Sequence, residues 1–403
     1  MQISALLAIP WKTLGGVLIA IVILLAMVTI HEFGHYVAGK ILGFRINEFA
    51  VGFGPAIFKK RSKKTGELFA LRIIPLGGYC AFEGEDEYDE PKKNEPQEQP
   101  FEELVSYTEN TENPENTQND GGMSLTKEEK EYPTPKGKRF NDQPPWKRII
   151  VLVAGATMNY LLALLLIFCM FGFIGQPLYE VVAPREGKYL SPAYEVGDII
   201  ESIESKNVYL ITDYIDLLKG KQKGDEVEIG VIRNGERVTI NLTLEYNAEF
   251  VNTSDTGTLL GVMGLDGLQM VKVKQDFFTT IGRSFVYSIK IGGSVLRTLG
   301  ELLTGKIGLD AMGGPITTIT STAQATSGGI FPTLNIAALI GVNLAVFNLL
   351  PIPALDGCKV IFCIIEWIRK KPVNRKVETI IHLVGILFLF GFAILVDILQ
   401  WIL

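Results

Sequence analysis

Histidine is scarce in this chain, with only three among its 403 residues. Two of them, His31 and His35, lie four residues apart in the segment His-Glu-Phe-Gly-His, and the third is His382. Cysteine is also sparse, with four in total and none between Gln176 and Ile330. This distribution argues against a disulfide framework and against a cysteine-based zinc site. The sequence also lacks a basic stripe with interleaved aromatic residues, which argues against nucleic acid as a partner.

Long apolar runs are abundant by contrast, because 47% of the residues are hydrophobic. A membrane-spanning helix needs about 20 apolar residues, and four segments reach that length: 13–38, 148–175, 334–364 and 377–402. The third contains Pro351 and Pro353, so we expect a broken helix that lines an enclosed or wet cavity. The first run resembles a signal peptide, but it lacks a small-residue cleavage site before His31 and is predicted to be a retained span.

Basic residues are concentrated in two of the links between these spans. They cluster at 59–64 and 136–148 between the first two spans, and at 369–376 between the last two. The positive-inside rule places both links in the cytoplasm. Both termini and the region 176–333 are then expected outside a plasma membrane that the chain crosses several times, with the histidine pair towards the cytoplasmic side.

The histidine pair lies at the inner end of the first apolar run. On a helix, His31 and His35 share one face, where two imidazoles are able to hold a zinc ion. Glu32 between them is suited to take a proton from the attacking water. Ionisable residues at membrane depth are costly and usually functional. The pattern therefore predicts hydrolysis inside a membrane, with Zn²⁺ as cofactor and Glu32 as the catalytic base.

A zinc enzyme needs a third protein ligand, and Asp356 is the best candidate. It lies in the segment Asn348-Leu-Leu-Pro-Ile-Pro-Ala-Leu-Asp356-Gly357, within the third apolar run. An Asp at membrane depth is expensive unless a cation neutralises it. The structural alternative is a turn or helix cap, because Asp-Gly after prolines is common in turns. Beside the histidine pair we favour the ligand interpretation.

Three further polar residues in the predicted spans are considered for a functional role. Asn159 and Asn348 either form hydrogen bonds between helices or position substrate and stabilise the developing oxyanion. His382 is a lone histidine in the last span, and we expect it to contact a neighbouring helix rather than ligate the metal.

The links and the outward region also carry local signals. Residues 52–81 have the Gly-punctuated pattern of β-hairpins, whereas 83–135 are polar and favour disorder. Asn234-Gly235 predicts a two-residue hairpin in a compact β-rich unit. Residues 277–303 have helical periodicity and suggest an amphipathic helix on the outer membrane surface.

At these motifs the chain resembles the site-2 protease family of intramembrane zinc metalloproteases, in particular bacterial members with one PDZ domain. The resemblance rests on the motifs already named and on five others: Gly52-Phe-Gly-Pro, Gly77-Gly-Tyr79, Gly155-xxx-Asn159, Ser191-Pro-Ala with Gly197-Asp198, and Gly313-Gly-Pro-Ile. It implies that His31, His35 and Asp356 bind zinc and that Glu32 is the base. It also implies that Asn159 and Asn348 bind the substrate backbone.

The implied fold is an α-helical polytopic membrane protein with about four transmembrane helices, a membrane-associated β-hairpin region and an inserted β-rich PDZ-like domain. The expected parts are a first span with the hairpin (1–82), an acidic cytoplasmic linker (83–145), a second span (146–176), a PDZ-like domain (177–262), an extracytoplasmic amphipathic helix and connector (263–333), and the last two spans (334–403). The spacing between Ser191-Pro-Ala and Gly197-Asp198 is shorter than usual for a PDZ domain, which questions its peptide groove. Cys358 follows Gly357 where the family often has a second glycine, and we expect it to be a packing thiol.

The resemblance implies single-span membrane proteins or signal-peptide remnants as substrates, with the bilayer as the surrounding medium. A catalytically silent membrane scaffold is the main alternative, although a scaffold has no need of the base and all three ligands. A metal transporter should have further ionisable sites across the bilayer, whereas here they cluster at one depth. The sequence does not identify the substrate or the oligomeric state.

Overall fold

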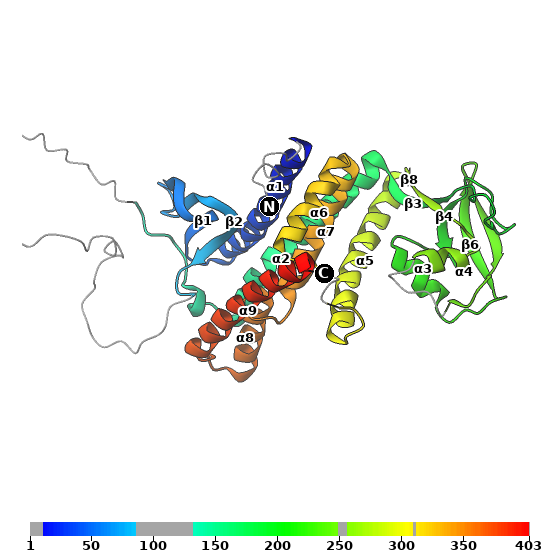
Figure 1. Cartoon of the computed structure of the whole chain (residues 1–403). Helices are drawn as coiled ribbons and strands as arrows, with labels where there is room; N and C mark the ends of the chain where they lie inside the picture. Colours follow the sequence, from blue (N-terminus) through cyan, green and yellow to red (C-terminus); the bar gives the residue numbers. More distant parts are fainter. Residues whose placement is uncertain (1–10, 86–131, 249–255, 309–311, 403) are drawn as a thin grey trace, which may run out of the picture.

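The computed structural model describes residues 11–85, 132–248, 256–308 and 312–402, so most of the predicted 83–135 linker lies outside the described residues. Within these ranges, four helices are long and apolar enough to cross a membrane. They belong to α1 (Trp11–Leu42), α2 (Pro145–Cys169) with the π-helical turn η3 (Met170–Ile174), α7 (Ile330–Leu349) and α9 (Arg375–Ile402). Figure 1 shows these helices grouped between two β-sheets. The four predicted spans are confirmed as apolar helices of spanning length.

The third span is broken, as the prolines predict. Helix α7 begins at Ile330, four residues before the expected boundary at 334, and ends at Leu349. A turn over 350–355 follows, and a separate helix α8 (Asp356–Arg369) begins directly after it. Proline lacks a backbone N–H and disfavours helix in the residue before it, so Pro351 and Pro353 end the helix here.

Small residues allow the central helices to approach closely. A Cβ at Gly34 of α1 would lie 2.4 Å from the Ala154 carbonyl oxygen of α2. A Cβ at Gly16 would lie 2.6 Å from the Ala323 carbonyl oxygen of α6 (Pro315–Ser327). Close backbone contact through small residues is the usual way in which helices associate in lipid, where no hydrophobic effect draws them together.

The predicted hairpin region is a sheet of two long, bent strands, β1 (Ile46–Arg61) and β2 (Leu68–Phe82). Residues 48–51 pair with 78–81 on one side and with 68–71 on the other, while 58–61 pair with 68–71. Each strand therefore bends so that two of its segments take part in the sheet. The segment 78–82 lies at one edge of the sheet. Gly52 has φ of 86° at the bend of β1, a backbone conformation that glycine adopts without strain.

The second sheet is the β-rich unit expected in the outward region. Its path is β7 (Glu236–Thr243), β6 (Glu226–Arg233), β4 (Ile199–Ile203), β3 (Gln176–Val181) and β8 (Leu268–Val273), and β5 (Lys206–Asn207) pairs with β4. Asn234 and Gly235 both have positive φ between β6 and β7, which confirms the predicted two-residue turn. The apolar core beneath the sheet is covered by α3 (Ile211–Leu218) and α4 (Thr256–Val262). Because β8 pairs with β3, the unit extends past the predicted boundary at 262.

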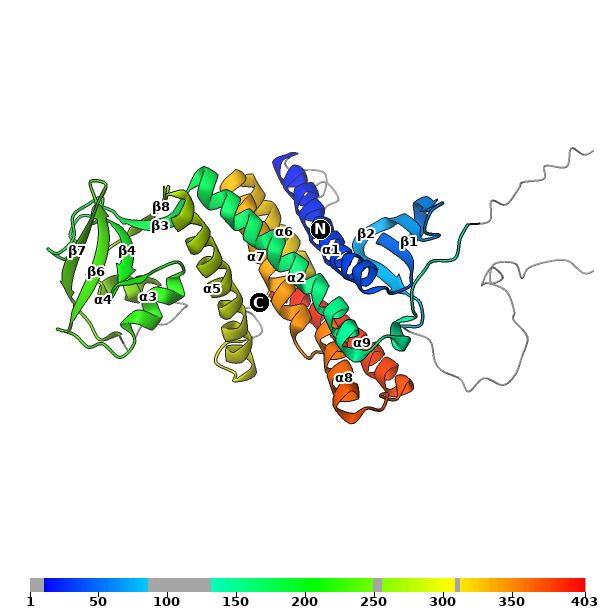
Figure 2. The ribbon, with the colours of Figure 1, turned by 180° about the vertical axis from the view of Figure 1, so that it is seen from behind.

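Residues 277–303 form a helix, α5 (Phe277–Leu303), as predicted. It packs along α2 and α7: Tyr287 donates to Asn335 of α7 at 3.1 Å, and Ser288 bonds Tyr160 of α2 at 2.8 Å. Figure 2 shows α5 between the central helices and the six-stranded sheet. Basic side chains of α5 pair with acids of that sheet domain. Its predicted place on the outer membrane surface stays a prediction.

Candidate metal centre and its relatives

The two motif histidines lie on one face of α1, one helical turn apart. Both are buried, and their Nε2 atoms are 3.1 Å apart. The i, i+4 spacing brings them together because successive turns of an α-helix place such residues above one another. Glu32 lies next to His31 in the sequence and lines the same cavity, whose volume is about 420 Å³.

Asp356 reaches this pair from a different part of the chain. It is the first residue of α8, directly after the broken span, and its Oδ2 lies 3.0 Å from His31 Nε2 and 3.2 Å from His35 Nε2. Tetrahedral zinc with ligand bonds near 2.0 Å separates its ligand atoms by about 3.3 Å. The three side chains therefore fit a zinc ion, with one coordination position left open. Within the described residues, they are the one cluster of this kind.

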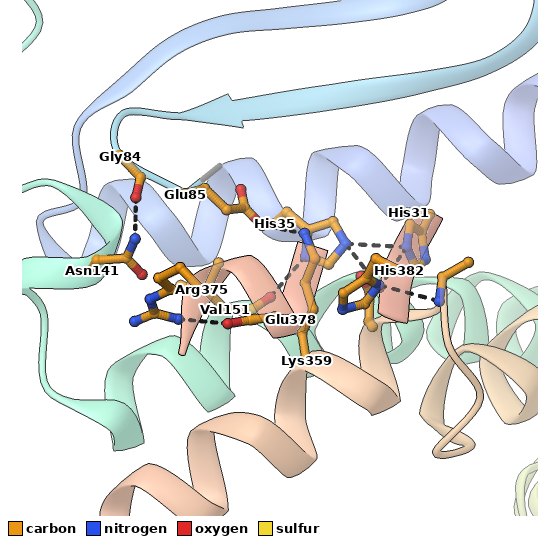
Figure 3. Close-up of polar contacts among 12 residues, drawn as sticks. His31, His35, Gly84, Glu85, Asn141, Val151, Lys359, Arg375, Glu378 and His382 are labelled. Carbon is orange, nitrogen blue, oxygen red and sulfur yellow. Dashed lines mark hydrogen bonds and ion pairs between the residues drawn. The ribbon is translucent and has the colours of Figure 1, made fainter. Parts of the chain in front are cut away.

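The ring of His35 is held in the orientation that metal binding requires. Its Nδ1 lies 2.8 Å from the Val151 carbonyl oxygen of α2. A carbonyl only accepts hydrogen bonds, so Nδ1 carries the proton and Nε2 presents a lone pair towards the other two ligands. Such an outer contact is the usual means of fixing the tautomer of a metal-binding histidine. Figure 3 shows this contact beside His31.

Asn159 lies beside His31 as Val151 lies beside His35. Its amide nitrogen is 3.4 Å from His31 Nδ1, while its buried Oδ1 has no hydrogen-bond partner among the described residues. If His31 Nε2 presents a lone pair, Nδ1 carries the proton and needs an acceptor. Turning the amide by 180° exchanges its nitrogen and oxygen and supplies Oδ1 as that acceptor. The hydrogen-bond network around an Asn amide decides between its two orientations. Asn159 is thus directed at a predicted metal ligand.

Gly155 explains why the two helices meet so closely at this point. A Cβ there would lie 2.4 Å from His35 Nε2 and 2.8 Å from His31 Cε1. Val151, Gly155 and Asn159 are spaced four residues apart and lie on one face of α2. That face forms the platform on which both histidine rings rest.

The predicted residue Asn348 is placed differently. It is half-buried in the last turn of α7, two residues before the break. Within the described part of the chain, the hydrogen bonds of the three clustered side chains involve Asn159 and not Asn348. Its predicted role in substrate binding stays a prediction.

The edge of the first sheet borders the metal cavity. Tyr79, Cys80, Ala81 and Phe82 line it, and a Cβ at Gly78 would lie 3.3 Å from Glu32 Cγ. A backbone edge therefore runs beside the residues that would carry out the chemistry.

Three contacts near the centre were not predicted from the sequence. They are the Val151 carbonyl, the ion pair of Lys359 with Glu85 at 2.6 Å on the cavity lining, and a hydrogen bond from Ala354 N–H to His382 Nδ1 at 3.2 Å. The last agrees with the expectation that His382 contacts a neighbouring element, because Ala354 belongs to the turn before α8. A main-chain acceptor such as Val151 has no residue-type signal in a sequence. Cys358 is buried, as expected for a packing thiol.

Two helix-borne histidines, a carboxylate and an adjacent glutamate, enclosed by helices of membrane-spanning length, define a membrane metallopeptidase. The chain belongs to peptidase family M50, whose model matches residues 19–392. It is 27% identical to a zinc metalloprotease RasP from Bacillus licheniformis over 93% of this chain and 96% of that protein. It is 28% identical to the regulator of sigma-W protease RasP from Bacillus subtilis over 92% of this chain and 94% of that one.

These matches cover nearly the whole chain, which is a membrane protein and an intramembrane zinc metalloprotease of the site-2 type.

Proposed function

We propose that this protease hydrolyses peptide bonds within or near the transmembrane segments of single-span membrane proteins, including signal-peptide remnants. We assign His31, His35 and Asp356 as the zinc ligands and Glu32 as the catalytic base. The observation that carries this assignment is the convergence of three ligand atoms, 3.0–3.2 Å apart, beside Glu32 in one cavity.

The side chains of this site have separate tasks in peptide hydrolysis. Glu32 takes a proton from the attacking water and returns it to the leaving amine. Zinc, when bound by His31, His35 and Asp356, polarises the scissile carbonyl and makes water a better nucleophile. The Val151 carbonyl holds the proton of His35 on Nδ1, and the Asn159 amide, turned so that its oxygen faces His31 Nδ1, would do the same for His31, which keeps both Nε2 atoms available. This contact supports a positioning role for Asn159, and its role in substrate binding stays a prediction.

The substrate must present an extended backbone, because the carbonyls of a transmembrane helix are engaged in its own hydrogen bonds. The segment 78–82 offers an edge for such a backbone. One side of this segment pairs with 46–51, and its residues line the metal cavity. We propose that an unwound substrate adds to the sheet here as a further strand, which would satisfy its freed N–H and C=O groups.

The proposed orientation has both termini and the six-stranded domain outside the cell, with the metal centre towards the cytoplasm. Its support is the distribution of basic residues described above. Strands β1 and β2 and the six-stranded domain lie on opposite sides of the helix group (Figure 1). We further propose that this domain is PDZ-like and screens substrates by the size of their outer parts. The short loop from Ser191 to Asp198 is stabilised by Asp198. This carboxylate accepts from Glu195 N–H at 2.9 Å and pairs with Arg233 at 2.7 Å.

The decisive test is cleavage of a tagged single-span model protein in membranes by the natural chain and by Glu32→Gln at equal expression. Zinc content is measured on the same preparations. We expect cleavage to be abolished while zinc is retained, because the amide fills the same space but takes up no proton. Equal cleavage by both forms would remove Glu32 from the mechanism. Zinc bound without cleavage by either form, across several model proteins, would favour a silent scaffold.

A further inference from the structure

The turn that carries Asp356 to the two histidines contains an unusual backbone conformation. Ala354 has φ of 82°, in the left-handed region that side-chain-bearing residues seldom adopt. It lies between Pro353 and Leu355, two residues before Asp356. Such strain persists only where the surrounding structure imposes it, and it is concentrated at functional sites.

The last helix is in contact with this turn. His382 of α9 accepts a hydrogen bond from Ala354 N–H through Nδ1 at 3.2 Å, so the imidazole proton is on Nε2. One turn further along α9, a Cβ at Gly385 would lie 2.4 Å from Pro353 Cβ, which shows that the two backbones touch. The His382 ring also packs against Phe362 of α8, with ring centroids 6.1 Å apart. Figure 3 shows His382 directed at the turn beside the metal cluster.

Much of α9 is otherwise apolar and exposed in the way expected of a lipid-facing helix. Its neighbouring side chains Leu383, Val384 and Leu387 are all more than half exposed. A histidine in such a helix needs a polar partner, and the partner here is the strained turn. The contact therefore joins α9 to the element that supplies the third ligand.

We propose that His382 is a positioning residue for Asp356. Its hydrogen bond holds Ala354 in the left-handed conformation, which fixes where α8 begins and keeps the Asp356 carboxylate 3.0–3.2 Å from both histidines. His382 itself does not bind the metal in this arrangement. The proposal rests on the ligand set assigned under the proposed function, and it makes the last helix part of the metal site.

The test measures zinc affinity of the detergent-purified full-length chain by competition with a chelating dye, which requires no cleavage. His382→Leu removes the acceptor of Ala354 N–H and should weaken zinc binding about tenfold, the lower end of the effect of losing a group that directly supports a metal ligand. His382→Asn keeps an oxygen where Nδ1 stood and should stay within threefold of the natural chain. Leu383→Ala, the exposed neighbour, is the control for a change in α9 as such.

Ala354→Gly provides the second half of the test, because glycine adopts a positive φ without strain. It should change zinc affinity little in the natural chain, but restore most of the loss in the His382→Leu background. Zinc affinity that is unchanged in His382→Leu, or a loss that Ala354→Gly does not repair, would overturn the proposal. Absence of zinc binding by the natural chain would instead contradict the assigned ligand set. If His382→Leu fails to fold, His382→Asn and Ala354→Gly/His382→Asn are compared with the natural chain, and a loss in either would count against the proposal.

Discussion

Two carboxylates in this molecule, the half-buried Asp356 and the buried Glu201, are compensated in different ways. At the metal centre, Asp356 Oδ2 lies 3.0 Å from His31 Nε2 and 3.2 Å from His35 Nε2, and His35 presents a lone pair there because its Nδ1 donates to Val151. At the junction of α5 with the six-stranded sheet, Glu201 accepts from Arg283 at 2.5 Å and from Arg237 at 2.7 Å. In this second cluster, the positive charges that balance Glu201 come from the chain itself. The first brings three electron-pair donors together and needs a cation.

This difference separates a functional cluster from a structural one. Burying a charge without a partner costs several kcal/mol, so both sites must be compensated. The junction uses a stripe on α5, in which Arg283, Lys290 and Arg297 are spaced seven residues apart and pair with Glu201, Asp213 and Asp216, respectively. With the proposed ligands, the metal centre instead needs an ion from solution, and its integrity should then depend on zinc and on chelators.

The largest effect should follow from Asp356→Asn. The amide is a poor zinc ligand, so we expect zinc affinity to fall at least about 100-fold, with loss of cleavage. Asp397→Asn is a matched control, because this buried carboxylate lies away from the metal centre, accepts from Ile316 N–H at 3.0 Å and caps α6. The control should lower thermal stability and leave zinc affinity unchanged. Equal zinc affinity of Asp356→Asn and the natural chain would contradict the ligand assignment.

Arg283→Met should damage the junction and spare the metal centre. Glu201 keeps Arg237 but loses its buried partner, and we expect a loss of about 2 kcal/mol in the stability of the docked domain. Faster limited proteolysis between the six-stranded domain and α5 would report it. The double variant Arg283→Met/Glu201→Gln should be less affected than the single one, since no buried charge is left unpaired. A fall in zinc affinity with unchanged proteolysis would contradict the interpretation of the Glu201 cluster as a structural junction that is independent of the metal centre.

Asn159→Leu tests the outer contact of the metal centre. Loss of the acceptor for His31 Nδ1 should weaken zinc binding about tenfold, whereas Asn159→Asp keeps an acceptor and should retain the ion. Asn343→Leu is a control at another Asn of the helix bundle. If Asn159→Leu lowers cleavage while zinc affinity stays constant, Asn159 acts on the substrate instead.

The smallest effect should be the response of the junction to acid. Burial by itself would raise the pKa of Glu201, but hydrogen bonds from Arg237 and Arg283 outweigh it and hold the pKa below its ordinary value. A lowered pKa contributes stability that is complete above the unfolded pKa of about 4.3 and is lost as pH falls through the folded value. Protease resistance of the junction should therefore be constant between neutral pH and about pH 5 and decline below that range. The Arg283→Met/Glu201→Gln variant should show a flatter profile.

Much of the fold could be predicted because it depends on local patterns. Spanning length, the prolines at 351 and 353 and the Asn234-Gly235 turn each act through residues close in sequence. The distant partners of two elements could not be found in this way. Strand β8 joins β3 across about 90 residues of chain, and α5 has the amphipathic pattern of a surface helix because its polar stripe meets another domain. Both outcomes depend on partners that are distant in sequence.

The sequence by itself determined the chemistry of this protein. The i, i+4 histidines with their glutamate, and a carboxylate too costly to bury alone, are fixed by residue type and spacing. Tertiary structure alone decided that Asp356 meets the histidines, that Val151 and Asn159 lie against the two rings, and that the last helix contacts the turn before Asp356. The physical reason is that hydrogen bonds and metal coordination act over about 3 Å, and only folding brings residues so far apart in the chain within that distance.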